Sequence, residues 1–288
     1  MNFTLAAVLS LTSAALYGAA DFLGGLGARR TSTIVVVLVS QLTGMVLLAG
    51  MLTLLPHSTP STRDLIYGGV AGLAGGTGVA LLYRALAVGA MAVVAPTTAV
   101  CAVAISVIAA LLFGERPSRL RLLGIALALV AIVLVSQQRA PAGGKESHVA
   151  ARRLPPGLGL ALLSGVAIGL FFLALARTAS TAGLWPLLVA RMASAGLFGA
   201  AAVASGRSLR MPALVAATVV ACGVIDMLAN ALYLIATRYA ALSVVVTLAS
   251  LYPASTVILA RVVLGERLNG WQDLGIACAL VAVVLIVK

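Results

Sequence analysis

Residues 114–135 read GERPSRLRLLGIALALVAIVLV, and a related stretch follows in the second half of the chain. This second copy, at residues 265–286, reads GERLNGWQDLGIACALVAVVLI and agrees with the first at 13 of 22 positions without a gap. The offset is 265 − 114 = 151 residues, about half of the 288-residue chain. The sequence therefore predicts two copies of one structural unit, each closed by this stretch.

The composition indicates a membrane protein. Hydrophobic residues make up 62% of the chain, charged residues only 9%, and the mean hydropathy is +1.16, whereas a soluble domain is about half apolar and about a quarter charged. The apolar runs are continuous and lack a period of two, which favours helices over a barrel. We predict an all-α membrane protein with ten transmembrane helices, at residues 4–23, 33–55, 65–87, 91–113, 119–137, 157–177, 182–205, 212–236, 242–264 and 270–287.

Five predicted helices fall in each half, which sets the organisation of the chain. We expect a first five-helix repeat at residues 1–137, a polar linker at 138–156 and a second five-helix repeat at 157–288. An odd number of spans makes the second copy enter the membrane from the opposite side. Inverted repeats of this kind build a binding site at the bilayer midplane that opens to either face, so the pattern favours transport.

Charge, cysteine and histidine patterns exclude several other classes. The net charge of +12 does not predict nucleic-acid binding, because the arginines stand singly or in pairs between apolar runs and suit loops beside lipid head groups. The three cysteines lie within apolar runs and match neither zinc nor disulfide spacing. His57 and His148 fall in separate loops. We therefore expect no metal site.

The repeated unit resembles the EamA-type drug/metabolite transporters over nearly the whole chain. The matching positions are Tyr17-Gly18, Gly114, Glu115 and Gly124 in the first half, and Pro253, Gly265, Glu266 and Gly275 in the second. Pro96 departs from the pattern, since it lies six residues before Ala102, which occupies the place that matches Pro253. The resemblance implies a basket of ten helices, secondary active transport without a cofactor, and most often export of amino acids, metabolites or drugs. It also implies that the two glutamates order turns.

Two prolines within predicted helices are hinge candidates. Pro96 lies in the first third of the fourth predicted span and Pro253 near the middle of the ninth. Each removes a backbone donor and kinks a helix. Such kinks mark cavity walls or hinges in transporters, although plain structural kinks are equally common.

The charged residues at membrane depth are the main site candidates, because each costs about 2.5–3.5 kcal/mol on insertion. Arg191 and Asp226 are the deepest, with opposite charges on consecutive predicted helices. They form either a structural ion pair or a substrate and coupling site, and the two readings are compatible. Asn230 and Tyr233 follow Asp226 at i+4 and i+7, so the three share one helical face.

Three further polar residues are weaker candidates. Gln41 neighbours Ser40, the internal equivalent of Arg191 (191 − 151 = 40), and is a neutral hydrogen-bonding candidate. Tyr83 lies near the position equivalent to Tyr233 on the third predicted span. Asp21 lies near the end of the first span, either in the cavity or at the interface.

The leading prediction is a secondary active transporter that exports small metabolites such as amino acids, with Arg191 meeting a carboxylate and Asp226 an amine or a coupling proton. The alternatives are a proton-coupled drug exporter, an intramembrane enzyme or a structural membrane protein. No span contains a histidine, and we expect no enzyme. We expect a multi-pass protein of a cell membrane, in bacteria the inner membrane. Basic residues in the loops favour termini outside, whereas the resemblance implies cytoplasmic termini.

Overall fold

The computed structural model describes residues 3–54, 58–89, 91–135, 156–264 and 270–287. Within these ranges the chain is helical and contains no strand. The elements are α1 (Phe3–Arg30), α2 (Thr33–Leu54), α3 (Thr62–Val88), α4 (Met91–Leu112), α5 (Arg119–Val135), α6 (Leu158–Ala176), η1 (Ser180–Ala182), α7 (Trp185–Ala204), α8 (Ala213–Ala236), α9 (Leu242–Ala249), α10 (Tyr252–Leu264) and α11 (Gly270–Val287).

Each predicted apolar segment contains helix, but the ninth is divided. Seven helices are long and apolar enough to cross a membrane: α1, α2, α3, α4, α6, α7 and α8. Two shorter apolar helical stretches, Leu122–Leu134 and Leu242–Thr256, lie among the rest of the described residues. The chain is therefore a multi-pass membrane protein, while the count of ten spans stays a prediction. The predicted linker lies almost wholly outside the described residues.

The two prolines behave differently. Pro96 lies inside α4, which continues through it. Pro253 is the second residue of α10, directly after the interruption at Ser250–Leu251. Proline is tolerated in the first helical turn, where the missing N–H has no intrahelical partner. The ninth predicted span is therefore two helices, and Pro253 starts the second one.

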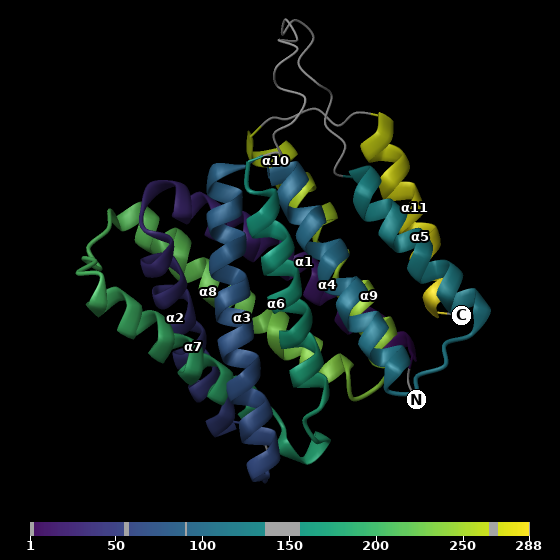
Figure 1. The fold of residues 1–288 in the computed structure, drawn as a ribbon, viewed down its shortest axis with the longest axis horizontal. Coiled ribbons are helices and arrows are strands. Elements are labelled where there is room, and N and C mark those ends of the chain that lie inside the picture. Colours follow the sequence, from purple (N-terminus) through teal and green to yellow (C-terminus); the bar gives the residue numbers. More distant parts are fainter. Residues whose placement is uncertain (1–2, 55–57, 90, 136–155, 265–269, 288) are drawn as a thin grey trace, which may run out of the picture.

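Helices of the two halves pack on each other in matching pairs. α1 packs on α8 and α3 on α6, and these pairs exchange under the 151-residue offset. The contacts of α4 with α6 likewise match those of α1 with α9 and α10. α2 pairs with its counterpart α7, and α5 with α11, at opposite edges of the molecule (Figure 1). Reciprocal packing is expected when two copies of one unit face each other about an approximate two-fold axis.

A pair of hydrogen bonds obeys the same offset. Ser13 Oγ on α1 donates to the carbonyl of Ala229 on α8 at 2.8 Å. Ser164 Oγ on α6 donates to the carbonyl of Gly78 on α3 at 2.7 Å. The donors differ by 164 − 13 = 151 residues and the acceptors by 229 − 78 = 151. The two halves thus share buried contacts as well as sequence.

Glycines let the central helices approach backbone to backbone. A Cβ atom added at Gly72 of α3 would lie 2.2 Å from the carbonyl oxygen of Ala190 on α7. One added at Gly223 of α8, its equivalent (223 − 72 = 151), would lie 2.4 Å from the carbonyl oxygen of Ser40 on α2. Such small faces permit close helix packing in a bilayer. They place α7 and α2, with the polar residues that follow Ala190 and Ser40, against the centre of the molecule.

The Glu115 side chain connects the two halves at the α4–α5 turn. Its carboxylate accepts hydrogen bonds from the backbone N–H of Leu242 at 2.8 Å and of Ser243 at 3.2 Å. These donors begin α9 and have no partner within that helix, and a negative charge is favourable there. Glu115 therefore orders the start of α9, while its counterpart Glu266 lies outside the described residues.

Candidate functional site in a central cavity

A cavity of about 60 Å³ lies between the two halves. Its lining comes from α1, α2, α3 and from α6, α7, α8, α10, so both repeats contribute. This volume exceeds the roughly 10–15 Å³ that a cavity needs to hold a water molecule. The walls are mainly apolar with a few polar groups, as expected for a site that binds a small molecule.

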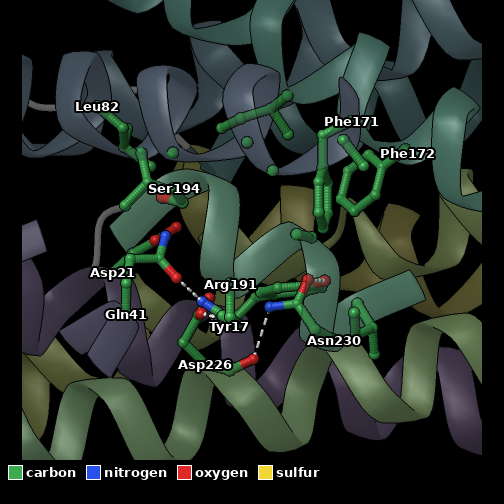
Figure 2. A pocket seen from close by; sticks show the side chains of 18 of the residues that line it. Tyr17, Asp21, Gln41, Leu82, Phe171, Phe172, Arg191, Ser194, Asp226 and Asn230 are labelled. Atoms are coloured by element: carbon green, nitrogen blue, oxygen red, sulfur yellow. Dashed lines mark hydrogen bonds and ion pairs between the residues drawn. The ribbon is translucent and has the colours of Figure 1, made fainter. Parts of the chain in front are cut away.

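Arg191 on α7 is the central polar group of the cavity. Its Nη2 donates to Asp226 Oδ2 on α8 at 2.6 Å, and its Nη1 donates to Gln41 Oε1 on α2. The guanidinium therefore lies between a carboxylate and an amide from two other helices (Figure 2). The Arg191 and Asp226 side chains are only 7% and 14% exposed, so each charge depends on the other for compensation in an apolar surrounding.

Asn230 extends this network along α8. Its Nδ2 donates to the backbone carbonyl of Asp226 at 2.7 Å, and its Oδ1 accepts from Tyr17 Oη on α1 at 2.9 Å. The Tyr17 ring stands edge-on to the Phe172 ring of α6, with centroids 6.0 Å apart. The network therefore runs from α2 through α7 and α8 to α1, and its aromatic end reaches α6.

Two buried polar groups of the cavity have no partner. The Asp21 carboxyl on α1 is 8% exposed and makes no hydrogen bond or ion pair among the described residues. Ser194 Oγ on α7 is also unpartnered there, in a residue only 1% exposed. Buried polar groups are normally hydrogen-bonded. These two are thus the groups best placed to take a partner from outside the protein.

The predicted tyrosines lie behind the cavity wall. Tyr233 Oη donates to the backbone carbonyl of Phe172 at 3.0 Å, and the two rings are 4.6 Å apart. Tyr83 Oη lies 3.2 Å from Cys222 Sγ. Neither tyrosine lines the cavity. The predicted Asp226–Asn230–Tyr233 stripe therefore differs from the structure at its last member, because the Tyr233 ring packs on Phe172 of α6 and its hydroxyl is bound to the Phe172 carbonyl.

The other predicted residues come together. Arg191, Asp226, Asn230, Gln41 and Asp21 all line the one cavity. Sequence reasoning missed several lining residues: Tyr17, Phe171, Phe172, Ser194 and Tyr252. Helical spacing was a usable signal for two of them. Ser194 follows Arg191 at i+3 and Tyr17 precedes Asp21 at i−4, so each shares a face with a predicted residue.

Metal binding finds no support in the described part of the chain. No group of three or more His, Cys, Asp or Glu side chains is placed there to hold a metal ion. Cys222 is buried and hydrogen-bonded to Tyr83 and to the carbonyl of Ala20. It therefore acts as part of the helix packing around the site.

A polar network in a cavity between two related helical halves is typical of a membrane transporter, and the comparisons agree with this class. A model of the EamA-like transporter family matches residues 4–137 and again residues 155–288. The chain therefore belongs to the EamA-like transporter family and contains two copies of its repeat.

Structural comparison supports the fold alone. A solved structure titled "Crystal structure of protein" matches with a TM-score of 0.72 at 17% identity, over 97% of this chain and 95% of that chain. Comparison with curated protein sequences gave no significant match.

Proposed function

We propose that this protein is a secondary active transporter that exports small polar metabolites such as amino acids across a cell membrane, in bacteria the inner membrane. The observation that carries the proposal is the Arg191–Asp226 ion pair inside a cavity to which both repeats contribute. An ion pair that only joined two helices would not need to line a cavity. Membership of a transporter family supports the same conclusion and argues against an enzyme.

The network suggests how a substrate would bind. A substrate carboxylate would take hydrogen bonds from Arg191, whose planar guanidinium suits carboxylates, in competition with Asp226 and Gln41. A substrate ammonium group would meet a cavity carboxylate, and Ser194 Oγ would supply a neutral hydrogen bond. Aromatic rings of Phe171 and Phe172 would contact the apolar part of the substrate.

Alternating access would follow from the repeated architecture. In the proposed cycle, residues 1–137 and 157–288 are inverted repeats that tilt relative to each other around the cavity. The interruption before Pro253, where α9 gives way to α10, is the proposed hinge, because residues between helix ends absorb backbone rotation. Pro96 in the uninterrupted α4 is the weaker hinge candidate.

A proton-coupled drug exporter is the second candidate. The aromatic lining from Tyr17, Phe171, Phe172 and Tyr252 favours it, since aromatic faces bind apolar and cationic ligands. In that case the substrate would carry no carboxylate. Such a substrate would not bind the Arg191 guanidinium, and the Arg191–Asp226 ion pair would stay intact.

We expect a cysteine at position 230 to react with a charged, water-soluble thiol reagent in a variant without the native Cys101, Cys222 and Cys278. Asn230 is only 3% exposed in the structure, so reaction reports opening of the cavity. Substrate should slow the reaction. The matched control is Leu228→Cys on the same helix, whose native side chain is exposed on the outer surface; it should stay unreactive because it faces lipid.

The labelling experiment has a clear negative outcome. A folded protein whose residue 230 never reacts, and which still transports with Asp226→Asn, would remove this face of α8 from the mechanism. Mass spectrometry of the labelled protein would provide the readout.

A further inference from the structure

Asp21 and Asp226 line the same cavity but differ in their partners. Asp226 has Arg191 at 2.6 Å, and Asn230 fixes the backbone at its position. Asp21 is only 8% exposed, yet it has neither a cation nor a hydrogen-bond donor as a partner among the described residues. An ionised carboxylate that is buried without a partner is costly, and such groups normally bind a proton instead.

Within the described part of the chain, no cation forms an ion pair with Asp21. α1 packs on α8, α10, α3, α9, α2 and α11, and α2 and α9 carry no titratable residue. The titratable groups that interact electrostatically with Asp21 are Asp226 and Cys222 on α8, Tyr83 on α3, Tyr252 on α10 and Tyr17 on α1. Arg191, the cation that lines the same cavity, is already bound to Asp226 and Gln41. Asp226 repels a second negative charge at Asp21.

Charge balance then assigns the two carboxylates different tasks. The Arg191–Asp226 pair is neutral as a unit, so the cavity has room for one further positive charge, at Asp21. We propose that Asp21 is a single-cation site, which holds a proton in the empty cavity and exchanges it for the ammonium group of the substrate. This rests on the proposed function and deepens it, because it names an amine-bearing substrate and separates its cation site from Asp226.

The exchange is balanced as a simple proton transfer. The Asp21 carboxylic acid gives its proton to a cavity water, which becomes a hydronium ion and leaves. The resulting carboxylate pairs with the ammonium group of the substrate, so that no covalent bond of the substrate changes. Release of the ammonium group to the outside and uptake of a proton there return Asp21 to the neutral acid. The direction of the proton gradient then drives export of the amine.

The test uses the full chain in detergent micelles or liposomes and n-propylammonium as the probe. This probe has only four heavy atoms, which suits a small cavity. The chain has only seven acidic side chains, so infrared difference spectra resolve a protonated carboxyl group. We expect the wild-type protein to show one carboxylic-acid band at neutral pH, and n-propylammonium to remove it with release of about one proton per protein.

Variants identify the carboxyl group that gives the carboxylic-acid band. Asp21→Asn, which keeps the size of the side chain, should lack both the band and the proton release. The control is Asp64→Asn, which removes a carboxylate that caps the start of α3 and does not line the cavity. It should retain both signals. Circular dichroism and size-exclusion profiles check that each variant is folded. If Asp21→Asn folds poorly, Asp21→Glu is the second test. It keeps a carboxyl group at the site and should therefore still release a proton.

Several outcomes overturn the proposal. These are absence of the acid band in the wild type, its persistence in Asp21→Asn, failure of n-propylammonium to release a proton, or equal release by sodium chloride. Flux is measured separately. Loss of metabolite export with intact exchange would remove the exporter proposal alone, whereas export by Asp21→Asn with an unchanged dependence on the pH gradient would remove the Asp21 proposal alone.

Discussion

Replacing Arg191 with Met should abolish transport and lower the free energy of unfolding by about 3–5 kcal/mol, the usual cost of breaking a buried ion pair by removing one partner. The change leaves Asp226, whose side chain is only 14% exposed, without its cation. It also removes the donor to Gln41. Yield in the membrane and thermal unfolding in detergent would measure the effect on folding, and substrate flux in proteoliposomes would measure the effect on transport.

The double variant Arg191→Met with Asp226→Leu should recover most of the lost stability but not transport. An apolar pair of similar volume is often as stable as a buried ion pair, whereas the substrate site is gone. Arg210→Met serves as the control, because Arg210 is an exposed loop residue and its loss should change stability by less than about 0.5 kcal/mol. Strictly additive losses in the double variant would show that the two side chains do not stabilise each other.

Gly72→Ala should destabilise the protein by about 1–3 kcal/mol or more, the range for overpacking a tight interior. The added Cβ would lie 2.2 Å from the carbonyl oxygen of Ala190 and 2.6 Å from its Cα. Both are backbone atoms, so α3 and α7 must separate to accept the methyl group. Separation moves Arg191, the next residue on α7, and transport should fall together with stability.

Gly69→Ala on the same helix is the matched control. Its added Cβ would lie 4.0 Å from the nearest atom, a methyl carbon of Val189, which is ordinary contact. Thermal unfolding and flux of this variant should match the wild type. Equal melting temperatures for Gly72→Ala and Gly69→Ala would contradict the close approach of α3 and α7.

Much of the helical architecture could be predicted from the sequence, because long apolar runs must satisfy their backbone polar groups within a helix. The repeat at 114–135 and 265–286 also predicted two related halves, which the family match confirms. The division of the ninth segment could not be predicted. Its apolar run continues through Ser250 and Leu251, and Pro253 predicts a kink as readily as the start of a new helix.

The charged residues of the candidate site could be predicted from their charge and from their position deep within apolar segments. Arg191 and Asp226 stood out because charges in apolar helices need a reason, and the internal repeat pointed to Gln41 on the opposite half. Tyr233 shows the limit of helical spacing. It shares a helical face with Asp226, yet its ring packs on Phe172 and its hydroxyl donates to the carbonyl of Phe172. Which part of a face meets the cavity depends on packing between helices that the sequence of a single helix does not encode.

The direct test of the central proposal is the composition of the medium around cells that overproduce the protein. Cells with the wild-type protein should accumulate at least one small amine-bearing metabolite outside, compared with cells that carry an empty vector. Cells with Asp226→Asn at a matched protein level in the membrane should lose most of that difference. No difference in any extracellular metabolite between wild-type and empty-vector cells, with the wild-type protein folded in the membrane, would contradict export by this cavity.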